Sequence, residues 1–190
     1  MPLRARREFF LATLFFTALS ALAAGPMDLR LRCEDGQATR LGAFTGNEKP
    51  CVLIFVASTC PASSLIWDRL KGTWYNHRDS GLRMALVGGN SDDTPEALRA
   101  LLKEAPSGLD LPILWDTGHE LAAALDVNST PVAVVLAPTG TVLYRGPIDD
   151  QWRNGARAQH PWLEEAVRAA LQGRKIEMHA PPPFSGSRMR

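Results

Sequence analysis

The feature that most constrains the fold is a continuous apolar run over residues 52–57 and a second, mostly apolar run over 82–87, with a helical pattern between them. A strand that is apolar at every position is buried on both faces, as in the core of an α/β protein. Apolar residues recur at helical spacing after Pro61, and proline is favoured in the first turn of a helix. The runs therefore predict two parallel buried strands joined by a helix.

The rest of the chain continues this alternation of strands and helices. The patterns predict helices from Thr94, over 117–125 and over 162–171, a short strand over 112–115, and hairpins over 27–41 and 132–145. Thr117 and Glu120 have the spacing of a helix-capping box. The order predicts an α/β three-layer sandwich, with a central mixed sheet, helices on both faces and an N-terminal β-hairpin extension.

Residues 1–23 have the layout of a secretory signal. Three arginines precede an apolar run over residues 9–22, and small residues around Ala23 offer a cleavage site. The run is short for a membrane span, so an uncleaved anchor is the alternative. The pair Arg6-Arg7 also resembles part of a twin-arginine signal. We therefore expect export to the periplasm or the extracellular space, where disulfides persist.

The remaining residues fit one domain. We expect it to span residues 27–175, followed by an extended tail over 176–190 that contains three consecutive prolines. With 21 Lys and Arg against 20 Asp and Glu, the net charge of +1 argues against nucleic acid as a partner. The four histidines have no metal-ligand spacing, so neither a metal site nor a cofactor is expected.

Cys60 is the candidate nucleophile. It follows the first buried strand and directly precedes Pro61, at the expected start of a helix. Unpaired N–H groups and the helix dipole at such a position stabilise a thiolate and lower the thiol pKa. The carboxyl end of a strand is also where open α/β sheets bind ligands. The alternative is an inert small residue at the end of a strand.

The other two cysteines are poorly placed to react with Cys60. Cys51 begins the strand that precedes Cys60, and nine extended residues at ~3.3 Å each would separate the two by about 30 Å. Cys33 lies on the expected N-terminal hairpin, and we expect it at the same remote end as Cys51. These two residues form either a structural disulfide or two buried thiols.

Three segments carry a resemblance to a known family. Residues 52–61, continued as Cys60-Pro61-Ala62-Ser63, resemble the active-site region of the thioredoxin-like superfamily. Thr130-Pro131 resembles the cis-proline segment of that fold. Residues 144–151 resemble a stretch of exported bacterial redoxin-domain proteins, the AhpC/TSA or peroxiredoxin-like branch. The resemblance covers about residues 28–175 and implies a thioredoxin-like fold.

The resemblance also implies roles for individual residues. Cys60 would be the nucleophile, Ser63 would donate a hydrogen bond to its sulfur, and Pro131 would shape the docking surface for a disulfide or peptide. Supporting positions in the same segments are Thr59, Pro61, Thr130 and Arg145.

Departures from the family pattern limit which thiol reactions are expected of Cys60. Ser63 stands where thioredoxins have a second cysteine, and Gly186 is followed by Ser187 rather than by a cysteine. Without a resolving thiol of its own, Cys60 would stall as a mixed disulfide or sulfenic acid until an external thiol arrived. Ala57 and Leu53 replace the threonine or serine and the proline of typical peroxiredoxins, which puts peroxide activation in doubt.

Three hypotheses follow. The first is an exported thiol–disulfide oxidoreductase with one nucleophilic cysteine and an external thiol or disulfide protein as its partner. The second is a one-cysteine thiol peroxidase, and the third is a non-catalytic binding module of thioredoxin-like fold. In each, contact with a membrane is expected only through the signal or an uncleaved anchor.

Overall fold

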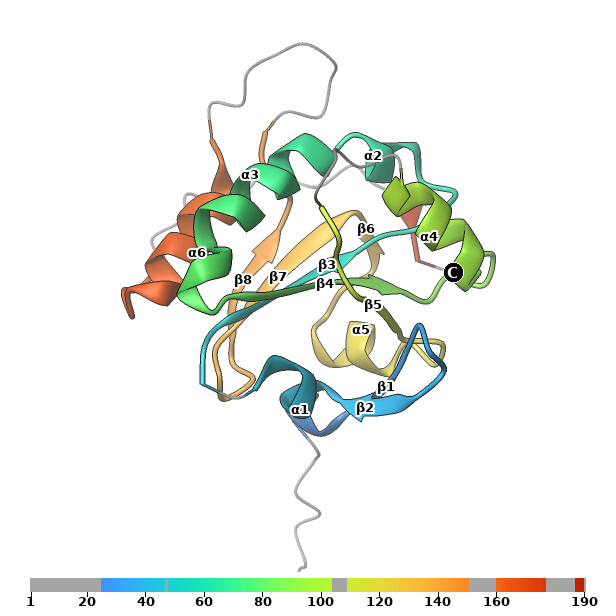
Figure 1. The fold of residues 1–190 in the computed structure, drawn as a ribbon, viewed down its shortest axis with the longest axis horizontal. Helices are drawn as coiled ribbons and strands as arrows, with labels where there is room; N and C mark the ends of the chain where they lie inside the picture. Colours follow the sequence, from blue (N-terminus) through green and yellow to red (C-terminus); the bar gives the residue numbers. More distant parts are fainter. Residues whose placement is uncertain (1–24, 47, 104–108, 151–159, 177–186, 190) are drawn as a thin grey trace, which may run out of the picture.

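The computed structural model describes residues 25–46, 48–103, 109–150, 160–176 and 187–189. Within them, a seven-stranded sheet has the order β2-β1-β5-β4-β3-β7-β8 (Figure 1). Its strands are β1 (Arg30–Cys33), β2 (Ala38–Arg40), β3 (Cys51–Phe55), β4 (Arg83–Gly88), β5 (Ile113–Trp115), β7 (Val132–Leu136) and β8 (Val142–Gly146).

The sheet is mixed, as expected. Strand β3 runs parallel to β4 and antiparallel to β7, and β4 runs parallel to β5. The N-terminal hairpin β1–β2 joins the edge of β5 in antiparallel register. Every residue of β3 and β7 is buried, because helices cover both faces of the sheet.

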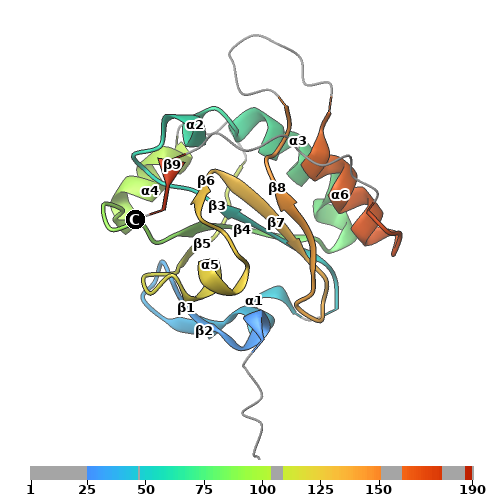
Figure 2. The same ribbon diagram turned by 180° about the vertical axis from the view of Figure 1, so that it is seen from behind.

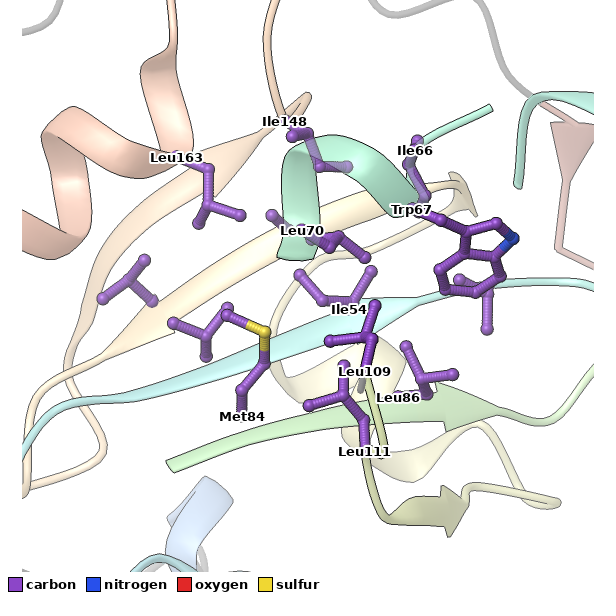
Figure 3. Packing of buried hydrophobic residues seen from close by; sticks show 14 of the residues in the cluster. Ile54, Ile66, Trp67, Leu70, Met84, Leu86, Leu109, Leu111, Ile148 and Leu163 are labelled. Atoms are coloured by element: carbon purple, nitrogen blue, oxygen red, sulfur yellow. The ribbon is translucent and has the colours of Figure 1, made fainter. Parts of the chain in front are cut away.

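Helices pack on the two faces in separate hydrophobic clusters. One face carries α3 (Trp67–His77), α4 (Pro95–Lys103) and α6 (Trp162–Leu171), and the other carries α1 (Leu41–Thr45) and α5 (Glu120–Ala124). Successive residues of β3 alternate between them: Val52 and Ile54 join the first cluster, and Leu53 and Phe55 the second. Figure 3 shows Leu70 of α3 lying against Ile54 and its neighbours in the first cluster. This arrangement confirms the predicted three-layer α/β sandwich.

The helix expected after Pro61 is divided in two. A single turn, α2 (Pro61–Ser64), is followed by α3, and two 3₁₀ turns, η1 (Pro26–Asp28) and η2 (Arg78–Ser80), complete the helical elements of the described residues. The N–H of Leu65 donates to the carbonyl of Ala62, three residues back, at 3.3 Å. This tightening ends α2 before the regular helical bonds of α3 begin.

The predicted capping box at Thr117 is wrong. The buried carboxylate of Asp116 instead accepts hydrogen bonds from the N–H groups of Leu121 and Ala122, at 3.1 and 2.8 Å. A carboxylate at this end of α5 satisfies two N–H groups that have no partner within the helix. Asp116 can act in this way because it directly follows β5 and is buried, a position that spacing alone does not indicate.

The expected signal over residues 1–23 lies outside the described residues, as does most of the expected tail. In the part of the tail that is described, β9 (Ser187–Arg188) pairs with β6 (Ser129–Thr130) in a second, two-stranded sheet. No helix in the described parts of the chain is long and apolar enough to cross a membrane.

Candidate active site

Cys60 ends the tight turn that links β3 to α2. Its N–H donates to the carbonyl of Ala57 at 3.1 Å, and its own carbonyl accepts from the N–H of Ser63 at 2.9 Å. The side chain is only 3% exposed. The sequence forms this turn because the apolar strand ends at Ala57 and Pro61 starts a helical turn without needing an N–H partner.

Hydrogen bonds surround the sulfur of Cys60. Its thiol donates to the carbonyl oxygen of Thr130 at 3.3 Å. Burial raises the pKa of Cys60, but hydrogen bonds to the sulfur lower it by more, so the pKa lies below its ordinary value. The donors are the side chain and backbone of Ser187, the hydroxyl of Ser63 and the backbone of Ala62. The pKa shift predicted for Cys60 thus has the expected direction. Its cause is a set of local donors, because a helix of one turn has only a small dipole.

Ser63 is fully buried beside Cys60. Its hydroxyl oxygen accepts the N–H of Ala57 at 3.4 Å, and its hydroxyl hydrogen-bonds to the sulfur. The expected role of Ser63 as a donor to the thiolate is therefore compatible with the geometry. A hydroxyl in this place stabilises the thiolate but cannot form a disulfide with it.

The segment Thr130-Pro131 lies beside Cys60, as the resemblance implies. The peptide bond between the two residues is cis, and both side chains are buried. Thr59 and Pro61 flank Cys60 in the chain, and both are exposed. The structure therefore brings together Cys60, Ser63, Thr59, Pro61, Thr130 and Pro131.

Arg145 does not belong to this group. It lies on β8, where its guanidinium donates to the carbonyl of Leu125 at 2.9 Å and pairs with Asp126 at 2.6 Å. Through the registers of β8 and β7 it is level with Leu53, in the middle of β3 rather than at its carboxyl end. The predicted supporting role is corrected: Arg145 holds the C-terminal end of α5, because its long side chain reaches that free carbonyl.

Sequence reasoning missed an anchor of the active-site turn. One carboxylate oxygen of Asp93 accepts from the N–H and the hydroxyl of Ser58, at 2.7 and 2.6 Å, and the other accepts from the N–H of Asn90 at 3.3 Å. Asp93 therefore ties the turn before Cys60 to the loop between β4 and α4. No local pattern indicates this contact, since Ser58 and Asp93 are separated by 35 residues.

Cys33 and Cys51 do not form the disulfide that the sequence left open. All three cysteines are free thiols. The registers of β1, β5, β4 and β3 place Cys33 level with Phe55, about 13 Å along the sheet from Cys51 and ~14 Å across it. Disulfides need Cα atoms within about 7 Å. The expectation that both lie at one remote end is therefore wrong, since two strands intervene.

The pKa values of the other two thiols are raised, whereas the pKa of Cys60 is lowered. Burial raises the pKa of Cys51 to about 12. Burial and the nearby charge of Asp35 raise the pKa of Cys33. Of the three cysteines, Cys60 alone has a pKa below its ordinary value, which makes it the candidate for thiolate chemistry.

We predict that Ser63→Ala raises the pKa of Cys60, because the thiolate loses one of its donors. In the wild-type protein the pH midpoint for alkylation of Cys60 should lie below that for Cys33, since the first pKa is lowered and the second raised. The rate at each pH is measured by mass spectrometry of the cysteine-containing peptides. In Ser63→Ala the midpoint for Cys60 should move to higher pH.

Ser64→Ala is the matched control for this titration. The Ser64 hydroxyl donates to the carbonyl of Pro61 at 2.8 Å rather than to the sulfur. Equal midpoints in Ser63→Ala and Ser64→Ala would show that Ser63 does not stabilise the thiolate.

Within the described residues, no group of three or more His, Cys, Asp or Glu side chains is placed to hold a metal ion. The chemistry that this arrangement can perform is that of a partly activated thiolate with hydroxyl neighbours.

Known proteins resemble the chain over its domain. The model of the AhpC/TSA family matches residues 24–145. Human nucleoredoxin-like protein 1 is 31% identical over 121 residues, which are 60% of this chain and 57% of that protein. The chain therefore spans little more than half of the length of this relative.

Solved structures show the same fold. A hypothetical protein of Sinorhizobium meliloti 1021 has a TM-score of 0.73 and 23% identity, covering 87% of this chain and 92% of that one. A thiol-disulfide oxidoreductase from Bacteroides fragilis NCTC 9343 has a TM-score of 0.57 and 20% identity, covering 79% of this chain and 98% of that one. These similarities establish the α/β thioredoxin-like fold expected from the sequence.

Proposed function

The chain belongs to the AhpC/TSA family, and from this premise we propose that it is a thiol–disulfide oxidoreductase with Cys60 as its one nucleophile and an external thiol as its resolving group. The observation that carries this proposal is the environment of the Cys60 sulfur. Its pKa is lowered by hydrogen bonds, and the neighbouring position holds the hydroxyl of Ser63 rather than a second thiol.

In the first step, the Cys60 thiolate attacks one sulfur of a partner disulfide. A mixed disulfide with Cys60 forms, and the other partner sulfur leaves as a thiolate that takes up the proton lost by Cys60. An external thiolate then attacks the partner sulfur of the mixed disulfide and frees the Cys60 thiolate. The sum is R–S–S–R′ + R″–SH → R–S–S–R″ + R′–SH, so no electrons leave the sulfur atoms.

The proposal includes a location. The layout of residues 1–23 supports export, and disulfide-bearing partners occur mainly in oxidising compartments. The domain proposed to act there is the segment 27–175. N-terminal sequencing of the protein recovered from the fractionated producing cell tests this part: a mature chain that begins near Ala24 supports it, and an intact chain found in the cytoplasmic fraction contradicts it.

We predict that the reduced protein forms a mixed disulfide at Cys60 with glutathione disulfide and releases it when reduced thiol is added. Hydrogen peroxide, tested in parallel, should give sulfenic acid more slowly, because Ala57 and Leu53 occupy the positions where peroxiredoxins carry other residues. Peptide mapping with a sulfenic-acid probe measures both products. Faster reaction with peroxide would favour the peroxidase, and reaction with neither would favour a binding module.

A further inference from the structure

Two arginines of the N-terminal hairpin lie on the same face of the sheet as Trp115. Arg30 and Arg32 flank Leu31 in β1, and Leu31 is buried in the second hydrophobic cluster, the one with α1 and α5. Successive residues of a strand point to opposite faces, so both arginine side chains leave β1 on the other face. In the register of β1 with β5, Arg32 is opposite Trp115, which belongs to the first cluster. Both arginines are therefore on the face that carries α4.

A cleft of about 210 Å³ lies at this edge of the sheet. Its lining comes from β1, β5, the loop after β5 and the first residue of α5, and includes Arg30, Arg32, Trp115, Thr117, Gly118 and Glu120. Figure 2 shows β1 beside β5, with α5 close to both. The volume is below the roughly 300–1,000 Å³ of pockets for drug-sized ligands, so a ligand of this cleft is a small molecule.

The charged groups that line the cleft are not paired with one another. Arg30, Arg32 and Glu120 are exposed, and within the ranges that the structure describes none of them has an ion pair or a side-chain hydrogen bond. The Glu120 carboxylate lies over Gly118, where an added Cβ would be 3.9 Å from its Oε1 atom. Opposite charges therefore line one cleft at separations beyond the roughly 4 Å of an ion pair.

The other carboxylate of the cleft is already engaged. Asp116 also lines the cleft, but its side chain is buried and its two oxygens accept the N–H groups of Leu121 and Ala122 at the start of α5. Asp116 thus stabilises α5 and forms no ion pair with Arg30 or Arg32 in the described part of the chain. The two arginines and Glu120 are left as the groups that a ligand can bind.

We propose that this cleft binds a small free α-amino acid, with its carboxylate on Arg30 and Arg32 and its ammonium group on Glu120. Guanidinium groups match a planar carboxylate and can bind it through two parallel hydrogen bonds. A simple anion would meet repulsion from Glu120, and a simple cation would meet repulsion from the arginines. A zwitterion gives each of these charged groups a partner of opposite sign.

The need for both charges is tested with L-alanine and two blocked forms of it. N-acetyl-L-alanine lacks the ammonium group, and L-alaninamide lacks the carboxylate. Saturation-transfer NMR with the full chain detects binding at millimolar concentration. L-alanine should bind, and each blocked form should bind about tenfold more weakly or less, the effect of losing one charge-assisted hydrogen bond. Absence of L-alanine binding, or equal or stronger binding of a blocked form, would overturn the proposal.

The carboxylate contact is tested with Arg32→Gln, which should weaken the binding of L-alanine about tenfold or more. Arg40→Gln is the matched control. Arg40 is exposed on β2 opposite Arg30 and lies outside the cleft lining, so this variant removes the same charge from the hairpin and should keep wild-type binding. Equal losses in the two variants would mean that the general positive charge of the hairpin, and not the cleft, attracts the ligand.

The ammonium contact is tested with Glu120→Gln. L-alanine should bind about tenfold more weakly, whereas N-acetyl-L-alanine should bind at least as well as to the wild-type protein, because a repelling carboxylate is gone. Equal weakening of both probes would contradict the proposed role of Glu120. Because β5 and β4 lie between β1 and β3, exchange at Cys60 should keep its wild-type rate in this variant, so the cleft and the proposed function are tested separately.

Discussion

We expect Cys60→Ser to reduce thiol–disulfide exchange to the uncatalysed level while the fold is retained. A serine hydroxyl is not ionised near neutral pH, so the variant has no nucleophile at the carboxyl end of β3. The two remaining cysteines cannot replace it, because Cys33 and Cys51 lie elsewhere on the sheet and their pKa values are raised. The measurement is the rate of transfer from glutathione disulfide to the protein, with circular dichroism to verify the fold.

Cys33→Ser is the matched control for this prediction. Cys33 is partly exposed at the end of β1, and its replacement removes a thiol without touching the site. The control should retain the wild-type rate of exchange. Activity that survives in Cys60→Ser and disappears in Cys33→Ser would show that Cys33, and not Cys60, is the nucleophile.

Leu70→Ala should lower the free energy of unfolding by about 2–5 kcal/mol, the usual cost of truncating a fully buried leucine. Leu70 is 0% exposed on α3, and it packs in the cluster that contains Ile54 (Figure 3). Removing its side chain leaves a cavity between α3 and the sheet. Urea unfolding followed by tryptophan fluorescence measures the change.

Leu65→Ala provides the comparison with the same chemical change. Leu65 follows α2 and is 40% exposed, so its truncation should cost less than about 1 kcal/mol. Similar decreases in the free energy of unfolding in the two variants would mean that α3 does not pack on the sheet as described.

The local parts of the site could be predicted from the sequence. Cys60 and Ser63 are three residues apart, and both follow an apolar strand, so periodicity and the position of Pro61 placed them together. Thr130 and Pro131 were found through the resemblance to a family. Arg145 was placed with them in error, because its neighbours across β7 and its contact with α5 depend on strand register.

The distant parts of the site depend on chain segments that meet only after folding. Asp93 anchors Ser58 from the next loop, and Ser187 reaches Cys60 from the end of the chain. Neither residue has a local pattern that indicates its partner. The separation of Cys33 from Cys51 has the same origin, since the hairpin joins β5 and not β3.

The sequence by itself determined the alternation of buried strands and helices, the place of Cys60 at the end of β3 and the lack of a second thiol beside it. Those properties depend on residue type and on short spacings along the chain, and these set the local secondary structure directly. Only the tertiary structure decided what lowers the pKa of Cys60 and what covers its sulfur. Sheet order and register bring Thr130 and Ser187 to the thiol, and hydrogen bonds act only over such short distances.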